Sequence, residues 1–251
     1  MRVLILSDIH SNIEALQACL RAVPGYDAVV NLGDIVGYGA NPNEAVQRAR
    51  ELGGYLVRGN HDKAATGLID LSEFNPLAGM AALWTRNQLT AENLEWLRQL
   101  PQGPIQVPEL PDVQFVHGSP VDEDEYLVTP TDAVQSLLTF PVPVTFFGHS
   151  HVQGAFSSDP SEEGALRPVY ASVGRAESVD WELRAGAHYL INPGSVGQPR
   201  DGDWRAAFAI FDSEKRSVAF HRVPYDLKTA QDRIVAANLP PRLATRLAAG
   251  R

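Results

Sequence analysis

The sequence predicts an α/β fold in which a second β-sheet packs on the first. Short apolar runs rich in Val, Ile and Phe recur between residues 3 and 147, as buried strands do, and each is followed by polar residues of metal-ligand type. Two consecutive strand-helix-strand passes open the chain and imply parallel strand pairing. Further strand patterns lie in the C-terminal third.

The two opening passes have the same layout. The first strand is expected at Val3 to Leu6, and Ser11 and Glu14 have the capping-box spacing that starts the next helix. The second strand is expected at Ala28 to Leu32, and Asn41 is expected to cap the helix that follows it. A third short apolar run then completes the second pass.

The helical spacing of apolar residues in 64–100 predicts a helical insertion near the crevice where the strands end. Trp84 and Trp96 lie in it. Stacking on a nucleobase is one interpretation, but packing between helices is favoured because large aromatic side chains are mostly core residues. Residues 154–187 combine Gly, Ser, Pro and acidic residues with weak periodicity, which predicts loops, with an irregular edge strand as a further candidate.

The C-terminal third predicts a second sheet, with Asp212 to Lys215 as a hairpin turn. An amphipathic helix is expected from Lys228 to Ala237. The basic end of the chain, with Arg242, Arg246 and Arg251, is expected to be solvated surface. The strand candidates of this region are residues 189–191, 206–211 and 217–223.

Composition sets limits on function. The 251 residues are 44% hydrophobic and 20% charged, and we expect one domain spanning residues 1–251. The formal charge of −9 and the lack of a Lys/Arg block argue against duplex nucleic acid as a partner.

Cys19 is the only cysteine and is expected on a helix's inner face; no disulfide can form within the chain. No basic leader or long apolar run is present, so we expect a cytoplasmic protein without a membrane partner. The oligomeric state is not predicted.

Five short motifs follow the predicted strands and hold five of the seven histidines. Loops that leave the carboxyl ends of neighbouring strands converge on one crevice, so we expect these side chains to meet. Oxygen and imidazole ligands without a thiolate suit manganese, iron or zinc. Seven side chains are too many for one tetrahedral ion, which makes Asp34 the candidate for a carboxylate shared by two ions. The motifs are Asp8-Ile9-His10, Gly33-Asp34, Gly59-Asn60-His61-Asp62, His117-Gly118 and Gly148-His149-Ser150-His151.

A purely structural role is the alternative for each of these motifs. A single Asp or His at a strand end can cap a helix, but five buried polar groups of this kind would be costly without partners. His188 and His221 lie on strand patterns outside the motifs and are interpreted as structural. Asn192-Pro193-Gly194-Ser195 is interpreted as a supporting turn rather than a catalytic serine loop.

The motifs and their order resemble the calcineurin-like metallophosphoesterase superfamily, and more closely its small single-domain prokaryotic phosphodiesterase branch. Besides the metal motifs, residues 7–16, 33–39 and 192–200 carry the resemblance. It implies a four-layer α/β/β/α sandwich, with two mixed β-sheets stacked face to face and helices outside.

The resemblance also implies a site with two divalent or mixed-valence metal ions, Mn²⁺ or Fe/Mn first, with Zn²⁺ or Ni²⁺ as alternatives. A hydroxide that bridges the two ions would attack phosphorus. His61 would supply the proton to the leaving group, since an ordinary imidazole titrates near neutrality. The implied ligands are Asp8, His10, Asp34 and His151 for one ion, and Asp34, Asn60, His117 and His149 for the other.

Two departures from the family pattern bear on the substrate. Where the protein phosphatases and symmetrical diadenosine tetraphosphatases of the superfamily have Asp and Arg, this chain has Gly37 and Tyr38. The phosphate-gripping arginine and the carboxylate that orients the catalytic histidine are therefore missing from that loop. Asn60, Arg58 and Arg200 are candidates for contacting substrate phosphate, with a structural salt bridge as the alternative for each arginine.

The sequence thus predicts a metal-dependent phosphodiesterase that acts on a small phosphate ester, with cyclic or modified nucleotides among the candidates. The first alternative is a phosphomonoesterase or a diadenosine tetraphosphatase-like hydrolase. A second alternative is a non-catalytic scaffold, because one retromer subunit resembles this fold and has lost catalysis. The presence of His61 argues against the scaffold.

Overall fold

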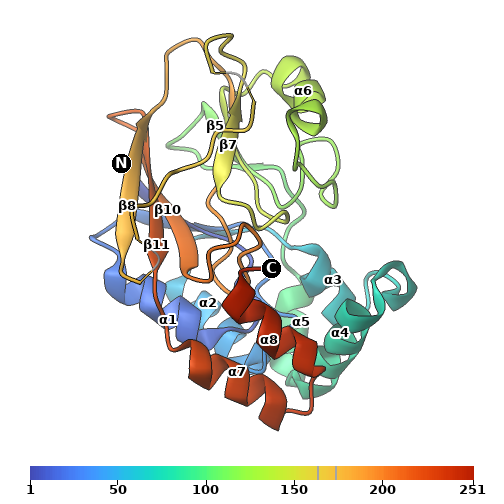
Figure 1. Ribbon diagram of the computed structural model, residues 1–251. Helices are drawn as coiled ribbons and strands as arrows, with labels where there is room; N and C mark the ends of the chain where they lie inside the picture. Colours follow the sequence, from blue (N-terminus) through green and yellow to red (C-terminus); the bar gives the residue numbers. More distant parts are fainter. Residues whose placement is uncertain (163, 173) are drawn as a thin grey trace.

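A computed structural model describes residues 1–162, 164–172 and 174–251 (Figure 1). Two β-sheets stack face to face, and helices cover their outer faces. This arrangement confirms the predicted four-layer fold. None of the helices within the described residues is long and apolar enough to cross a membrane.

The first sheet has six strands, and the opening passes of the chain form its parallel part. Helix α1 (Ile13–Ala22) connects β1 to β2, and helix α2 (Pro42–Leu52) connects β2 to β3. Strand β10 pairs antiparallel with β1, and β11 and β8 continue the sheet in further antiparallel pairs. In order across the sheet, the strands are β3 (Tyr55–Leu56), β2 (Ala28–Asn31), β1 (Arg2–Leu6), β10 (Ala206–Asp212), β11 (Ser217–Val223) and β8 (Glu177–Glu182).

The second sheet has five strands, with helix α6 (Pro130–Thr139) against its outer face. Strands β5, β6 and β9 run parallel, and β4 and β7 pair antiparallel at the two edges. In order, the strands are β4 (Ile105–Gln106), β5 (Val113–Phe115), β6 (Val144–Phe146), β9 (Tyr189–Asn192) and β7 (Gly154–Ser157).

The predicted division of strands between the sheets is wrong in two places. Strands β10 and β11 extend the first sheet, and of the three C-terminal candidates only β9 joins the second. Phe208 and Ile210 of β10 face the helix layer, whereas Ala209 and Phe211 face the other sheet. Because both faces of β10 are buried, its apolar pattern could not indicate which sheet it joins.

The segment predicted as loops contains two regular strands, β7 and β8. Strand β8 pairs with β11 over six residues, from Ser217↔Glu182 to Arg222↔Glu177. Its residues alternate between half-buried and exposed, as at a sheet edge, so polar side chains interrupt the apolar pattern that would have indicated it. Residues 163 and 173, in the same predicted loop region, lie outside the described residues.

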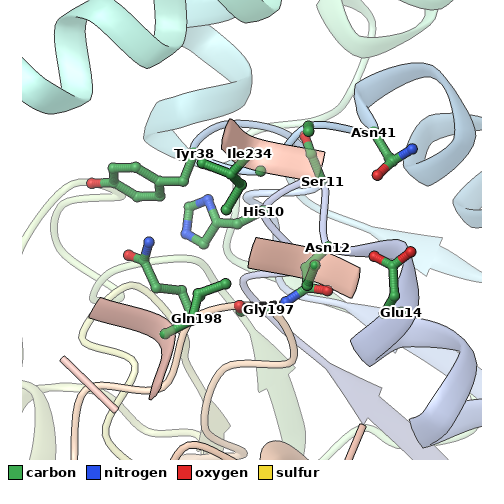
Figure 2. Close-up of a pocket in the computed structure, with 13 residues that line it drawn as sticks. His10, Ser11, Asn12, Glu14, Tyr38, Asn41, Gly197, Gln198 and Ile234 are labelled. Carbon is green, nitrogen blue, oxygen red and sulfur yellow. Dashed lines mark hydrogen bonds between the residues drawn. The ribbon is translucent and has the colours of Figure 1, made fainter. Parts of the chain in front are cut away.

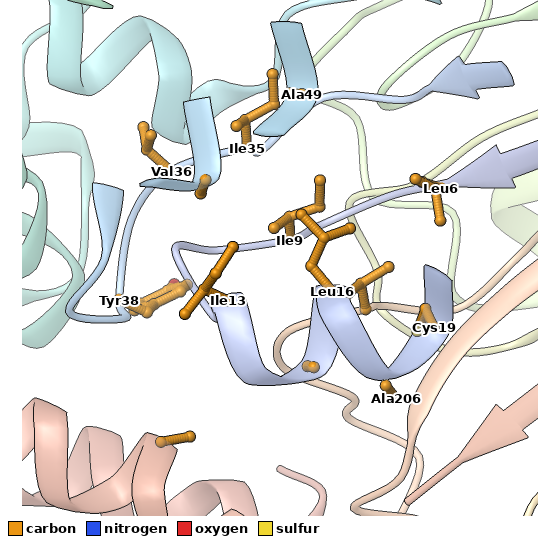
Figure 3. Packing of buried hydrophobic residues seen from close by; sticks show 14 of the residues in the cluster. Leu6, Ile9, Ile13, Leu16, Cys19, Ile35, Val36, Tyr38, Ala49 and Ala206 are labelled. Atoms are coloured by element: carbon orange, nitrogen blue, oxygen red, sulfur yellow. The ribbon is translucent and has the colours of Figure 1, made fainter. Parts of the chain in front are cut away.

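The core lies in two main layers. One apolar cluster fills the space between the sheets, and another joins the first sheet to its helices. Figure 3 shows the cluster between the first sheet and its helices. In it, Leu6 of β1 and Ile9 of the loop after β1 lie against Leu16 and Cys19 of α1. The predicted position of Cys19 on the inner face of a helix is confirmed.

The helical insertion is confirmed and lies beside the strand ends. It contains α3 (Asn60–Thr66), the 3-10 helix η1 (Leu71–Glu73), α4 (Pro76–Gln88) and α5 (Ala91–Arg98). Trp84 and Trp96 are half-buried and pack against the helix-side core, which confirms the packing interpretation.

The predicted helix caps need correction. Asn12, not Ser11, caps α1, and its side-chain oxygen accepts a hydrogen bond from the backbone N–H of Ala15 at 3.1 Å. Asn41 occupies the N-cap position of α2 as predicted, but its side chain donates to Glu44 Oε1 at 3.1 Å instead of binding the helix backbone.

Candidate metal centre

The candidate site lies where the ends of both sheets meet. The motif loops leave β1, β2 and β3 of the first sheet and β5 and β6 of the second. The sequence predicted that all motif loops leave neighbouring strands of one sheet. In the structure, the loops leave strands of two separate sheets. All seven predicted ligand side chains and His61 nevertheless come together there.

Backbone strain is concentrated in these loops. Five candidate ligands have positive φ, between +48° and +61°, although none is glycine. Each such residue costs about 1 kcal/mol or more, and it persists only where surrounding contacts determine the conformation. Here, for example, the backbone N–H of Asp8 donates to Gly33 O at 3.0 Å. The five are Asp8, His10, Asp34, His149 and His151.

The first group of ligand atoms belongs to Asp8, His10, Asp34 and His151, all buried. Nε2 of His151 lies 3.2 Å from Asp8 Oδ1. Nε2 of His10 lies 3.5 Å from Asp34 Oδ2 and 3.1 Å from Nε2 of His151. These atoms point into one small space, at a separation suited to a common cation.

The second group adjoins the first and shares Asp34 with it. Nε2 of His117 lies 3.5 Å from Asp34 Oδ2 and 3.1 Å from Nδ1 of His149. The side-chain oxygen of Asn60 is 3.4 Å from the same nitrogen of His117. Asp34 Oδ2 therefore lies at equal distance from a histidine of each group.

Each candidate histidine ligand is held through its other ring nitrogen. A carbonyl oxygen can only accept, so that nitrogen carries the proton and the nitrogen facing the cluster keeps its lone pair. The donor-acceptor pairs are His10 Nδ1 to Val36 O (3.1 Å), His117 Nδ1 to Leu32 O (2.7 Å), His151 Nδ1 to Gln198 O (2.6 Å) and His149 Nε2 to Asp124 O (3.0 Å).

These atoms fit divalent cations. Asp8 Oδ1 and Asp34 Oδ2 are buried and have no hydrogen-bond partner within the described part of the chain. The inward nitrogens of His10 and His151 are both acceptors at 3.1 Å and repel each other without a cation between them. A buried set of bare acceptors is unfavourable alone and is what a metal site requires.

Burial and charge shift the pKa values of the aspartates in opposite directions. Burial would raise the pKa of Asp8, but the adjacent His151 and His117 outweigh it and leave the pKa lowered. The pKa of Asp34 is raised well above its usual value, first by burial and then by the charges of Asp62 and Asp8. Without cations, Asp34 is therefore the carboxylate that most needs added positive charge.

His61 lies beside the cluster at the start of α3. Its backbone N–H donates to Asp34 Oδ1 at 2.8 Å, and its ring meets the ring of His10 edge to face at 4.9 Å. A side chain at Gly37, where φ is +99°, would place a Cβ 2.6 Å from His61 Nδ1. Burial, followed by the charge of Arg200, lowers the pKa of His61 well below its usual value, so the neutral imidazole is favoured.

A pocket of about 220 Å³ opens onto the cluster. Asn60, His61 and His149 lie on its metal side. Tyr126 also lines it and stacks on His149 with ring centroids 3.7 Å apart. Sequence reasoning missed Tyr126 because a single tyrosine in an acidic loop carries no local signal. The opposite wall comes from the helical insertion, through Ile69, Phe74, Asn75 and Ala78.

Comparison with known proteins agrees with this geometry. The model of the calcineurin-like phosphoesterase superfamily domain matches residues 1–216. The chain belongs to this superfamily. An uncharacterised protein of Methanocaldococcus jannaschii is 40% identical over 253 residues, which cover 99% of this chain and 98% of that protein.

Solved structures agree as well. The crystal structure of a metallophosphoesterase from Sphaerobacter thermophilus is 41% identical, with a TM-score of 0.85 and all of both chains covered. A hypothetical protein from Pyrococcus horikoshii OT3 shares the fold at 21% identity, with a TM-score of 0.78 over 100% of this chain and 98% of that one. The predicted family is confirmed. The superfamily binds divalent metals, and the two Asp/His groups are candidate ligands for them.

The two arginines singled out in this phosphoesterase differ in their partners. Arg58 donates to Glu123 through Nε at 3.0 Å and through a terminal nitrogen at 2.7 Å. Arg58 therefore forms a structural salt bridge, the alternative to a contact with substrate phosphate. The nearly buried Lys63 also binds Glu123, at 3.0 Å. These contacts hold the loop in which Asp124 orients His149. Arg200 lies instead beside Tyr38, with its guanidinium carbon 5.9 Å from the ring centroid.

A second, smaller pocket is lined by His10 and Tyr38. Figure 2 shows the His10 ring near Tyr38 and Gln198, with Ile234 of helix α7 (Leu227–Ala236) above it. Leu247 of helix α8 (Pro241–Ala249) lines the same pocket. The two C-terminal helices, which lie beyond the part matched by the superfamily model, therefore reach the candidate metal centre.

Proposed function

We propose that this phosphoesterase is a dinuclear phosphodiesterase that cleaves small phosphodiesters. The observation that carries the proposal is the position of Asp34 in both ligand groups, with Oδ2 buried, unpartnered and 3.5 Å from a histidine of each. A carboxylate in that position can serve two cations at once.

The proposed ligand sets follow the two groups. Asp8, His10, Asp34 and His151 would hold one ion, and Asp34, Asn60, His117 and His149 the other. The oxygen and imidazole donors suit Mn²⁺ or an Fe/Mn pair, with Zn²⁺ or Ni²⁺ as alternatives. When bound, two such ions supply charge that polarises the phosphoryl group and lowers the pKa of a water.

The remaining roles fall to residues at the pocket. If the Asn60 oxygen binds an ion, its amide N–H groups remain available to donate to a phosphoryl oxygen. His61 is the proposed proton donor to the leaving alkoxide, because its ring lies between the cluster and the pocket. The negative charge of a bound phosphodiester would raise the pKa of His61 and favour the protonated form that donates.

The shape of the pocket supports a diester substrate. A diester carries a second organic group, and the wall formed by Ile69, Phe74 and Ala78 offers an apolar surface for it beside the candidate metal centre. Tyr38 in place of arginine also leaves that loop without a guanidinium for a doubly charged monoester.

The first experiment compares substrates under defined metal loading. Protein stripped with chelator is reloaded with Mn²⁺, its metal content is measured, and kcat/KM is determined for bis(p-nitrophenyl) phosphate, p-nitrophenyl phosphate and diadenosine tetraphosphate. The diester should be the best substrate. Faster cleavage of either other compound would favour the corresponding alternative. A protein with two bound metals and no turnover of any of them would rule out the proposed hydrolase.

Replacement of His61 by alanine tests the proton donor. His61→Ala should lower kcat by about 100-fold on a diester with an alkyl leaving group, the usual size of a general-acid contribution. The loss should be much smaller with p-nitrophenolate, which leaves without a proton. Metal content should stay unchanged. Equal losses on both substrates would contradict proton donation.

A further inference from the structure

Two arginines from distant parts of the chain meet at Tyr38. The guanidinium carbon of Arg200 lies 5.9 Å from the Tyr38 ring centroid, and that of Arg246 in α8 lies 5.6 Å from it. The sequence predicted Arg246 on solvated surface. That prediction is wrong, because the side chain is half-buried against Tyr38.

Neither arginine forms an ion pair with a side-chain carboxylate of the described residues. Arg200 makes two long contacts, to the Tyr38 hydroxyl at 3.4 Å and to Gln198 Oε1 at 3.3 Å, and its Nε is buried without a partner in the same part of the chain. Nε of Arg246 donates to the main-chain oxygen of Arg251 at 2.5 Å. The acceptors at Tyr38 and Gln198 are neutral, so Arg200 has no ion-pair partner of its own among the described residues.

Nearby arginines show the usual arrangement. Arg205 and Arg222 are almost fully buried, and each forms an ion pair, with Asp203 and Asp201 respectively. A buried guanidinium is costly unless such a partner is present. Arg200 and Arg246 differ from them in having no Asp or Glu side chain as an ion-pair partner within the described residues, although Arg246 binds the main-chain oxygen of the last residue, Arg251.

The end of α8 is anchored to the loop that follows Arg200. The backbone N–H of Gly202 donates to Gly250 O at 3.0 Å. Gly250 ends the helix with φ +59°, and a Cβ there would lie 2.7 Å from the backbone nitrogen of Asp203. This close contact fixes Arg246 relative to Arg200, so their juxtaposition is built into the fold.

The arginine cluster borders the candidate metal centre. The Tyr38 ring centroid is 4.3 Å from that of His61 and 4.7 Å from that of His10. Burial, and after it the charge of Arg200, lowers the pKa of Arg246, as expected for two like charges held close together. A bound anion would offset this repulsion and give both guanidiniums hydrogen-bond acceptors.

We propose that Arg200 and Arg246, held at Tyr38, form a second anion subsite that binds a phosphate group of the substrate other than the scissile one. The inference rests on the proposed phosphodiesterase activity and narrows its substrate class. The substrate is then a phosphodiester that carries an additional phosphate, as a phosphorylated nucleotide ester does. The loop after Asp34 lacks an arginine, and residues from the far end of the chain supply the positive charge.

A matched pair of chromogenic substrates tests the subsite. Thymidine 5′-(p-nitrophenyl phosphate) is compared with its 3′-phosphorylated derivative, using the Mn²⁺-loaded protein. Wild type should prefer the 3′-phosphorylated ester by about tenfold in kcat/KM, the factor expected from one hydrogen bond between charged groups. Arg246→Gln should abolish the preference through KM, and Arg246→Lys should keep part of it. Arg242→Gln, which changes an exposed arginine of the same helix, should have no effect.

Three outcomes would overturn the subsite: no preference in wild type, equal loss on both esters in Arg246→Gln, or loss of the preference in Arg242→Gln.

A separate binding experiment distinguishes failure of the subsite from failure of the proposed enzyme activity. Inorganic pyrophosphate is titrated calorimetrically into metal-free protein, and Arg246→Gln should bind it about tenfold more weakly. If wild type cleaves neither ester but this difference is found, the proposed function fails and the anion subsite stands. Pyrophosphate binding without a 3′-phosphate preference would indicate a site for a free anion and overturn the substrate assignment.

Discussion

Asp34 is the residue on which both ligand groups depend. Its Oδ1 accepts from the backbone N–H of His61, which leaves Oδ2 for the cluster. The residue also adopts φ +54°, so backbone strain, burial and an unpartnered oxygen coincide at one position. Such a combination is expected where function rather than stability determines the residue.

Asp34→Asn should remove the shared charge while keeping the shape of the side chain. We expect kcat/KM to fall by at least about 100-fold, more than the loss of a residue that only orients a ligand. Bound metal should fall below two ions per chain, as measured by elemental analysis. Asp232→Asn, on the exposed face of α7, is the control. Two retained ions with full activity would show that Asp34 is not shared.

His221 gives a pH dependence that is independent of the metal centre. It stacks on Phe208 in the first sheet, and burial lowers its pKa from 6.5 to about 4, with the charge of Asp180 opposing and that of Arg2 assisting. The unfolded chain therefore takes up a proton at a higher pH than the folded protein does. The stabilisation is complete above pH 6.5 and is lost as the pH falls towards 4.

In metal-free protein, the free energy of unfolding should fall between pH 7.5 and pH 5 by about 2 kcal/mol more in wild type than in His221→Gln. Urea titrations at both pH values measure the difference, and the site histidines contribute equally to both proteins. The same pH dependence in both proteins would contradict the shift assigned to His221.

At the scale of elements, a buried ion pair holds the loops that carry His151 and Arg200. Arg222 of β11 pairs with Asp201 and donates to Gln153 Oε1 at 3.0 Å. The backbone N–H of Gln153 in turn donates to Asp201 Oδ2 at 3.1 Å. The first sheet is thereby connected to both loops, which explains how the ligand loops stay in strained conformations.

Asp201→Asn should leave the charge of Arg222 buried without its partner. We expect a loss of about 3 kcal/mol in the free energy of unfolding, measured in urea. The double variant Asp201→Asn/Arg222→Met should recover part of that loss because no charge stays buried. A single variant within about 0.5 kcal/mol of wild type would contradict the structural role of the pair.

At the scale of the whole molecule, the candidate centre connects two sheets. Asp8, His10 and Asp34 follow strands of the first sheet, whereas His117 and His149 follow strands of the second. An apolar cluster between the sheets supplies the other connection. We therefore propose that residues 1–251 fold as one domain.

Metal removal should lower the thermal stability of this domain. Cations that bind only the folded protein should stabilise it by about 3 kcal/mol at a concentration 100 times the dissociation constant. Calorimetry should show one transition, at a higher temperature with Mn²⁺ than with chelator. Asp34→Asn should lose most of that increase. Two separate transitions would contradict a single domain.

Much of the candidate site follows from local sequence. Asp8, His10 and Asp34 come directly after apolar strands, and the carboxyl ends of such strands gather side chains whatever the rest of the fold does. The helix caps were less predictable, because Ser11 and Asn12 are both good capping residues. Only the loop conformation, with Ser11 at φ +55°, assigns the cap to Asn12.

The sequence by itself determined most of the strand and helix pattern, the family, and the residue types that can hold metal ions, because these depend on local periodicity and on motifs of a few residues. Tertiary structure alone decided that β10 and β11 join the first sheet, that the ligand loops come from two sheets, and that Arg200 and Arg246 meet at Tyr38. The physical reason is the same in each case. Pairings between distant segments depend on packing of whole surfaces, and two-sided burial or a lone charged side chain carries no local sign of its partner.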